Sequence, residues 1–456
     1  MKLAVHTEGE SNRSEARQRW QAQQNSAAMQ ELLRRDEQVF LHQSLSSPCL
    51  TAIVKAQGIW IEDANGRRFM DFHGNSAHHI GYAHPKLIAA VKRQMDDLCF
   101  APRRFTCEPA IALAEKLADI APGNLGKTLF TTGGSDAIEV ALKVARAATG
   151  RFKTLSFWDA FHGAGFGASS VGGEATFRSG IAGPLLPGAE HVAPFACYRC
   201  HYKHQGPDTC GIACADVVSF VLEREGDIAA VVAEPMRATP YPPPPGFWKK
   251  VRDACDRHGT LLIFDEIPTG LGKTGKFFAS DHDGVTPDII VLGKSLGGGM
   301  LPIAAAIVRR DLDVCGDYAI GHYTHEKNPV TARAALTTIE IIEEEGLVER
   351  AAELGHYALN RLHELQSRSA YVGDVRGRGL LFGVELVRDR QSREPHNELA
   401  EAVYYRCLEE GLSFKISQGN VLTLSPSLVI SREELDRALA IVEQAILSAG
   451  GKGERS

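Results

Sequence analysis

The segment from about residue 86 to 330 alternates helical patterns with short apolar runs, and this alternation constrains the fold most strongly. The runs are "KTLFTT", "FKTLSF", "IAAVVAEPM", "TLLIFDE" and "DIIVLGK". They lack the polar–apolar alternation of a strand with one face in water, so both faces should be covered. Strands that alternate with helices in this way form a parallel α/β sheet. We therefore predict an α/β fold with a mainly parallel sheet in a large domain, residues 86–330.

The two ends of the chain predict a smaller α/β domain. Residues 11–42 are polar and charged with a helical pattern, and "TAIVKAQGIWIEDANGRRFMDF" predicts a strand meander with a turn at Asn65-Gly66. After residue 330, a long helical segment precedes "GDVRGRGLLFGVEL" and "NVLTLSPSLVI", which are typical of strands. We expect segments 1–85 and 331–456 to share this small domain.

Composition excludes several classes of protein. The formal net charge of -6 gives no basic field for nucleic acid. No apolar run approaches the ~18–20 residues of a membrane span, and the N-terminus lacks the apolar core of a signal peptide. Ten cysteines without an export signal favour reduced thiols. We expect a cytoplasmic protein without a membrane or nucleic-acid partner.

Two of the apolar runs end in groups that one cofactor would use together. Asp265 and Glu266 end one run, and Lys294 follows the next. Ligands of a parallel α/β sheet bind beyond the carboxyl ends of its strands. Pyridoxal phosphate needs an amine for its aldehyde and an aspartate beside its protonated pyridine nitrogen. Taken alone, a lysine and an aspartate at such positions are more often separate surface residues or members of ion pairs.

Two further stretches suit the same cofactor. "TTGGSDAIEVALKVARAATG" begins a helix whose first N–H groups and Ser135 hydroxyl suit a phosphate dianion, although Asp136 there is also compatible with plain capping. "FHG" follows an apolar strand, so Phe161 could stack on a flat ring while Ile267 covers the other face. Core packing is the alternative for a single phenylalanine.

In this order, the features resemble the fold-type I pyridoxal-phosphate enzymes of aminotransferase class III. The motifs that carry the resemblance are "TGGSDAIEVALK", "FHG", "VAEPM", "FDEIPTGLGKTG", "LGKSLGGGMLPIAA", "YTHEKNP" and "RGRGLLFGVEL". The likeness extends from about residue 45 to 445. It implies pyridoxal 5'-phosphate as the cofactor. Lys294 would bond to it and then move protons at the substrate carbon, and Asp265 would hold the pyridinium proton.

The resemblance also assigns cofactor contacts and an assembly. Gly134 and Ser135 would lie at the phosphate, and Glu234 near the substrate end of the cofactor. Thr324 in "YTHEKNP" matches a threonine that reaches the phosphate of a neighbouring subunit. This implies a homodimer with shared active sites.

One departure from the family concerns the acceptor. Many family transaminases carry an arginine in a C-terminal "R-L-x-P-P-L" strand, but here "LTLSPSL" has Thr423 in its place and Ser427 at the second proline. A guanidinium is the group best suited to a carboxylate. Its loss puts in doubt the usual half-reaction with 2-oxoglutarate. Lys415 is an alternative cation, but we expect it to be solvated.

A second departure concerns the substrate. "CFAPRRFTCEP" places Arg103 and Arg104 on a loop that borders the substrate pocket in the family, where two cations could hold a phosphonate or phosphate dianion. A surface arginine and an interface salt bridge are the alternative. In "HGNSAHHIGYAHP", Asn75, His78 and His79 are candidates for another pocket wall, and His78 or His79 could protonate a leaving group.

The motifs "RRFT", "CYRC" and "GHYTHEKNP" resemble most a class III subgroup that acts on aminoalkylphosphonates. The resemblance implies an ammonia-lyase that converts 1-hydroxy-2-aminoethylphosphonate to phosphonoacetaldehyde and ammonia. An aminotransferase for an ω-amine or amino acid, and an amino-acid epimerase, are the alternatives on this fold. A non-catalytic cofactor-binding regulator is disfavoured because Lys294 is present and no DNA-binding domain is attached.

Four cysteines form a separate pattern. Cys197, Cys200, Cys210 and Cys214 have C-x2-C-x9-C-x3-C spacing, which suits a structural zinc ion. Four reduced thiols or a labile disulfide are equally open at this stage. No metal is assigned to the catalytic centre.

Overall fold

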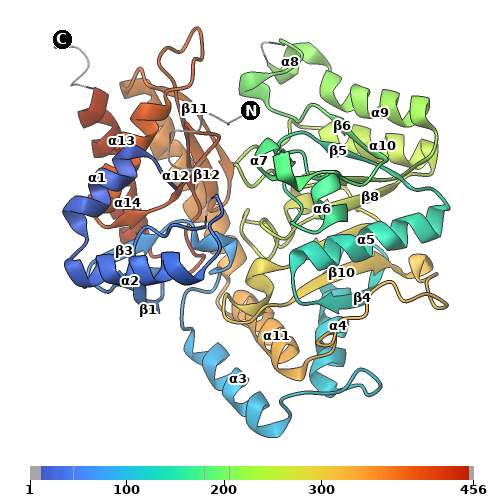
Figure 1. Cartoon of the computed structure of the whole chain (residues 1–456). Helices are drawn as coiled ribbons and strands as arrows, with labels where there is room; N and C mark the ends of the chain where they lie inside the picture. Colours follow the sequence, from blue (N-terminus) through green and yellow to red (C-terminus); the bar gives the residue numbers. More distant parts are fainter. Residues whose placement is uncertain (1–11, 45, 179, 205, 451–456) are drawn as a thin grey trace. The chain divides into compact units, whose positions relative to one another are not determined.

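Figure 1 shows the computed structural model of the chain, which describes residues 12–44, 46–178, 180–204 and 206–450. The predictions made for residues 1–11 and 451–456 lie outside this range. The chain divides into a small unit, residues 1–84 and 349–456, and a large unit, residues 85–348. The second boundary thus falls later than the expected 330/331, because helix α11 packs against helices α3 and α4 of the large unit.

The large unit contains a seven-stranded sheet in the order β4-β10-β9-β8-β7-β5-β6. The strands β5 to β9 run parallel, and β10 runs antiparallel to both of its neighbours. The mainly parallel sheet is confirmed; β6 and β10 are strands that the apolar runs did not predict. The strands are β4 Leu125–Thr131, β5 Lys153–Phe157, β6 Ala189–Val192, β7 Ile228–Ala233, β8 Leu261–Asp265, β9 Ile289–Leu292 and β10 Ala304–Arg309.

Helices cover both faces of this sheet, which explains the apolar runs without alternation. Val231 and Phe264 pack on the side of α9 and α10, whereas Val232 and Ile263 pack on the side of α5. Successive residues of a strand point to opposite faces, so every position of β7 and β8 is buried. The helices of the large unit are α3 Pro85–Asp97, α4 Glu108–Ile120, α5 Gly134–Thr149, α6 Phe166–Val171, α7 Ala175–Arg178, α8 Pro207–Cys210, α9 Ala213–Glu225, α10 Phe247–His258 and α11 Pro329–Glu344.

The small unit combines both ends of the chain in two four-stranded sheets, β1-β2-β3-β13 and β11-β12-β15-β14. The predicted meander is confirmed, and Gly66 in its turn has a φ of 78°. Strand β13 pairs in parallel with β3, which joins the C-terminal segment to the N-terminal one. The strands are β1 Ile53–Gln57, β2 Trp60–Asp63, β3 Arg68–Asp71, β11 Val372–Arg378, β12 Leu381–Leu386, β13 Leu412–Ser413, β14 Lys415–Ser417 and β15 Val421–Leu424.

The helical segments predicted outside the sheets are largely confirmed. The long segment after residue 330 is two helices, separated at Gly346, whose φ is 60°. Strand β15 covers only the first part of "NVLTLSPSLVI". Within the part of the chain that the structure describes, no helix could span a bilayer. The remaining helices are α1 Glu15–Gln24, α2 Ala27–Val39, α12 Leu347–Arg368, α13 Asn397–Glu409 and α14 Arg432–Gly450.

Candidate active site

The large unit gathers several predicted site residues at one edge of its sheet. Strands β5, β7, β8 and β9 are consecutive parallel neighbours, so their carboxyl ends share that edge. Asp265 ends β8 and pairs with Val291 of β9, and Lys294 follows shortly after β9. Glu234 follows β7, and Phe161 lies beyond β5. The sheet therefore explains how residues far apart in sequence reach one place.

Asp265 is a fixed, buried acid. It is 1% exposed, and its Oδ2 lies 2.8 Å from His162 Nδ1. Its Oδ1 accepts a hydrogen bond of 3.0 Å from the Ile267 backbone N–H. Both oxygens are thus held by the protein. In the described chain, the Nε2 of His162 is buried and has no hydrogen-bond partner.

His162 was not among the predicted site residues, although it is the central residue of the "FHG" motif. A buried carboxylate at a strand end requires a donor, and a histidine after a neighbouring strand can supply one. These two features of the sequence together could have indicated that His162 contacts Asp265. By holding Oδ2, His162 fixes the direction of the Asp265 carboxylate.

The start of helix α5 lies close to the segment that follows β5. Ser135 Oγ accepts a hydrogen bond of 3.0 Å from the Ala164 N–H. A Cβ on Gly163 would lie 2.3 Å from Ser135 Oγ, and one on Gly134 would lie 2.6 Å from Ile267 Cδ1. The first N–H groups of the helix have no partner within it by geometry. This close-packed helix start therefore suits a phosphate.

Substitution of Gly163 should disturb that cradle. In Gly163→Ala, the new Cβ would lie 2.8 Å from the Ser135 Cα, at a φ of 133°. Overpacking costs about 1–3 kcal/mol, so we expect cofactor affinity to fall by about 5- to 150-fold. Fluorescence titration of the cofactor measures this. Gly150→Ala is the control, because Gly150 also has a positive φ of 68° but nothing lies within 4 Å of its Cβ position. Equal affinity of the parent and Gly163→Ala would contradict the cradle.

Ile267 and Phe161 are the two predicted ring contacts. Ile267 lies between Gly134 and Gly293, whose added Cβ atoms would come 2.6 and 3.3 Å from its side chain. Phe161 is 38% exposed, and its ring centroid lies 4.4 Å from that of Phe177. One residue is thus held rigidly near Asp265, and the other presents part of its ring. Their stacking roles stay predictions.

Glu234 adds a second acid to this edge. Burial raises the pKa of the Glu234 carboxyl; His162 and Arg237 oppose this shift and Asp265 reinforces it. Arg237, which was not predicted, is 3% exposed and donates from Nη2 to the Asp159 carbonyl at 3.1 Å. Acids, a histidine and an arginine therefore share one charged cluster.

Lys294 begins a short 3₁₀ helix, Lys294–Gly297, and its side chain is exposed. Its φ is 41°, in the left-handed region that non-glycine residues rarely adopt. Such a conformation persists only where the surroundings impose it, and it often occurs at functional sites. The backbone thus gives Lys294 a fixed direction after β9.

The predicted substrate residues Arg103 and Arg104 lie on another loop. Arg103 is half-buried and contacts His322 through Nη2, whereas Arg104 is exposed. Cys107 Sγ lies 3.4 Å from the Lys327 carbonyl. The arginine loop is thereby joined to the loop that carries Thr324, whose side chain is exposed. The roles of Arg103, Arg104 and Thr324 in binding stay predictions.

His78 belongs to the small unit and is packed there. It is 1% exposed, its Nε2 lies 3.0 Å from the Asp71 carbonyl, and its ring stacks on Tyr82 with centroids 5.4 Å apart. These contacts show how its ring is fixed. Its predicted part in protonating a leaving group is not tested by them.

The side chains at the positions that depart from the family pattern make hydrogen bonds to nearby residues. Thr423 is 4% exposed and donates to Ser417 Oγ at 2.8 Å. Ser427 is fully buried and donates to the His79 carbonyl at 2.9 Å. Lys415 is half-buried in β14. The Thr423 hydroxyl, at the position of the family arginine, therefore forms a hydrogen bond between two strands of the sheet.

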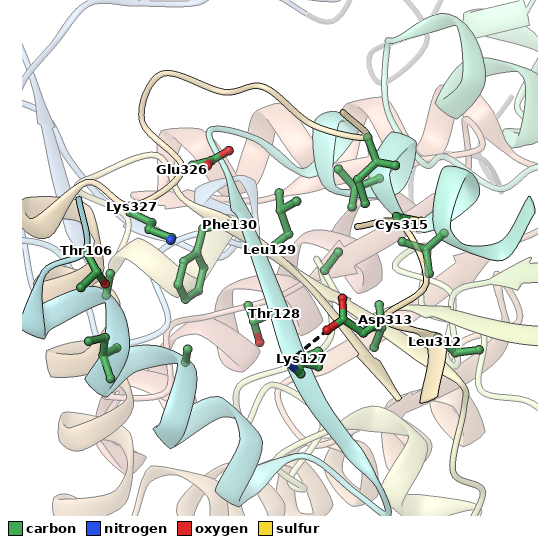
Figure 2. A pocket seen from close by; sticks show the side chains of 18 residues that line it. Thr106, Lys127, Thr128, Leu129, Phe130, Leu312, Asp313, Cys315, Glu326 and Lys327 are labelled. Carbon is green, nitrogen blue, oxygen red and sulfur yellow. Dashed lines mark ion pairs between the residues drawn. The ribbon is translucent and has the colours of Figure 1, made fainter. Parts of the chain in front are cut away.

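Figure 2 shows a separate apolar pocket of about 450 Å³ on the large unit. Side chains of β4, α4 and α5 line it, among them Phe130, Leu129 and Ile111. Lys127 and Asp313 form an ion pair of 3.0 Å at this pocket. None of the predicted cofactor residues lines it, so it is not the cofactor site.

The residues at the sheet edge fit pyridoxal phosphate. Asp265 is buried and offers a carboxylate for a cation. Among the described residues, the Nε2 of His162 is a buried polar atom without a hydrogen-bond partner. Gly134 and Gly163 let the helix start pack closely against Ile267 and the segment after β5, where a larger side chain would clash. When bound, the cofactor supplies an electron sink for a carbon that bears the substrate nitrogen. Lys294, Asp265 and Ser135 are the groups that would hold it.

Comparison with known proteins agrees with this site. The family model "Aminotransferase class-III" matches residues 42–446. The chain is 45% identical to the (R)-1-hydroxy-2-aminoethylphosphonate ammonia-lyase of Vibrio splendidus over 96% of this chain and 95% of that protein. It is 38% identical to the leucine/methionine racemase of Thermococcus litoralis, over 91% and 95% of the two chains.

A solved structure gives the same result for the fold. An amine transaminase from an uncultivated Pseudomonas species, in its pyridoxal-phosphate-bound form, superposes with a TM-score of 0.85 at 31% identity, covering 90% of this chain and 99% of the other. The predicted fold type and cofactor are confirmed. The chain belongs to the aminotransferase class III family of pyridoxal-phosphate enzymes.

Proposed function

We propose that this enzyme is an ammonia-lyase that converts (R)-1-hydroxy-2-aminoethylphosphonate to phosphonoacetaldehyde and ammonia. The observation that carries the proposal is Thr423, which stands where many family transaminases have an arginine and whose hydroxyl is bonded to Ser417. An elimination needs no keto-acid acceptor, so it does not require that arginine. The name of the Vibrio splendidus relative supports the same reaction.

The residues at the sheet edge would have different roles in this reaction. Lys294 would take a proton from the carbon that bears the nitrogen, and Asp265, oriented by His162, would keep the pyridine nitrogen protonated. The hydroxyl on the adjacent carbon then leaves with a proton as water. One water hydrolyses the released enamine to the aldehyde and ammonia, so the net reaction consumes no water and no oxidant. Incubation without a keto acid, followed by assays of ammonia and aldehyde, tests the proposal.

Arg103 and Arg104 are proposed to bind the phosphonate dianion. A charged hydrogen bond contributes about 1.5–3 kcal/mol, so removing one should lower kcat/KM for the phosphonate by roughly ten- to hundredfold. We expect Arg103→Ala to raise KM far more for phosphonates than for a carboxylate amine. Arg93→Ala on the exposed face of α3 is the control. An equal loss for both substrate classes would assign Arg103 a structural role through His322 instead.

We also propose a homodimer in which Thr324 serves the neighbouring subunit. Its exposed side chain and the apolar pocket of Figure 2, which the same loop borders through Glu326 and Lys327, support a second copy as the partner on this face. The ten cysteines are free thiols in the structure, which favours a compartment that keeps thiols reduced, and we propose a cytoplasmic location as well.

Thr324→Ala should weaken cofactor retention, because a hydroxyl that donates to a phosphate oxygen is lost. The expected cost is about 1.5–3 kcal/mol. Equilibrium dialysis of the cofactor measures it, with Thr331→Ala on α11 as a control of the same residue type. A fully active monomer in dilute solution, seen by sedimentation, would contradict both the dimer and this role.

A further inference from the structure

The four cysteines of the C-x2-C-x9-C-x3-C pattern come together in the folded large unit. Cys197, Cys200, Cys210 and Cys214 all line one cavity of about 20 Å³. That is about the space that one water molecule needs, so the cavity is too small for an organic ligand. His201, His204 and Tyr202 complete much of its wall. All four cysteines are half-buried.

The backbone holds the two ends of this cysteine loop on different elements. Cys197 begins a 3₁₀ helix, Cys197–Arg199, Cys210 ends α8, and Cys214 lies in the first turn of α9. The Ile212 N–H donates to Cys210 Sγ at 3.3 Å. Four thiols on separate short elements therefore line one small cavity, and four cysteine thiolates are a common ligand set of structural zinc ions.

We propose that these four cysteines bind one structural Zn²⁺ ion. As the side chains stand in the described chain, no three His, Cys, Asp or Glu residues form a set that could hold a metal. The thiols line the cavity, and they would have to rotate about χ1 to converge on the ion. Zinc favours four thiolates in a tetrahedral, closed site, and binding would release protons from the thiols.

The ion would fix the loop that leads into α9. Ile212 and Cys214 pack against the core on the α9 and α10 side of the sheet, and Lys250 of α10 donates to the Gly211 carbonyl at 2.6 Å. These contacts anchor the second half of the loop, and Ala196, just before Cys197, packs against the same core. Coordination by Cys197 and Cys200 would tie the first half to the same point.

Elemental analysis of the full-length, cofactor-loaded enzyme, purified without chelator or metal-binding tag, tests the proposal. We expect about one zinc per chain. Cys200→Ser and Cys210→Ser should each lose most of the metal, whereas Cys99→Ser, an exposed cysteine outside the pattern, should keep it. Enzyme produced with Co²⁺ should show thiolate-to-cobalt charge-transfer absorption. That spectrum decides the matter alone if a serine variant fails to fold.

Three results would overturn the proposal. One is a folded, reduced enzyme that takes up no zinc when Zn²⁺ is offered while all four thiols react with a thiol reagent. Another is mass spectrometry that finds the four cysteines in disulfides after purification from a reducing cytoplasm. Zinc retained equally by Cys200→Ser, Cys210→Ser and the parent would also contradict it, because the ion would then lie elsewhere.

Discussion

Lys294→Ala is expected to abolish both covalent attachment of the cofactor and turnover. Lys294 is the amine that follows β9, held at a φ of 41° next to the strand that carries Asp265. Its loss removes the nucleophile for the cofactor's aldehyde and the base that moves the substrate proton. General acid–base catalysis alone contributes about 10²–10⁴-fold, so turnover should fall by at least this factor.

Borohydride reduction followed by peptide mass spectrometry measures the attachment. The parent should carry the cofactor's mass on the peptide that contains Lys294, and the variant should carry it nowhere. Lys276→Ala is the matched control, since this lysine lies on the turn after β8 and has no predicted role. A cofactor found on another lysine of the parent, or full turnover by Lys294→Ala, would contradict the assignment.

Asp265→Asn is expected to leave the fold intact and remove most of the activity. An amide cannot hold a protonated pyridine nitrogen as a carboxylate does, and its NH2 group would face one of the donors now supplied by His162 Nδ1 and the Ile267 N–H. Removing one partner of a buried charge pair costs about 3–5 kcal/mol. We therefore expect kcat to fall by roughly 100- to 1,000-fold or more, with a visible change in the cofactor's absorption.

Glu266→Gln separates this effect from damage to the strand end. Glu266 accepts hydrogen bonds of 3.0 and 2.9 Å from the Ala279 and Ser280 N–H groups and one of 2.9 Å from the Thr269 hydroxyl. Burial raises the pKa of Glu266 to about 7 against the effect of these bonds. The substitution should lower the melting temperature while leaving the cofactor's spectrum as in the parent. If Asp265→Asn and Glu266→Gln had the same effects, Asp265 would be a structural residue.

The apolar runs were sufficient to predict five strands of the large sheet, because burial on both faces removes polar residues from them. Strand β10 was not predicted, and its antiparallel direction could not be, because a run of buried residues such as "AAAIV" has the same composition in either orientation. Strand β6, "AEHV", is short and half polar, so it produced no signal. The apolar pattern of α11 likewise does not predict which of the two units the helix packs against, and the predicted boundary at residue 330 was therefore too early.

For the site, residues at strand ends were predictable because parallel topology alone brings them to one edge. His162 and Arg237 were missed because a histidine after a strand, or an arginine in a loop, is usually packed or solvated for other reasons. Arg103 and Thr324 lie on loops, whose conformation hydrophobic periodicity does not determine. The roles of these two residues therefore depend on the resemblance to class III enzymes.

Product stoichiometry with (R)-1-hydroxy-2-aminoethylphosphonate as the sole substrate tests the central proposal most directly. The proposed lyase should release one ammonia per phosphonoacetaldehyde, turn over many times without a keto acid and keep the cofactor in its starting form. An aminotransferase would stop after about one equivalent per active site, with the amino group left on the cofactor, and would resume only when a keto acid is added. An epimerase would release neither product. Either of those two results would contradict the ammonia-lyase assignment.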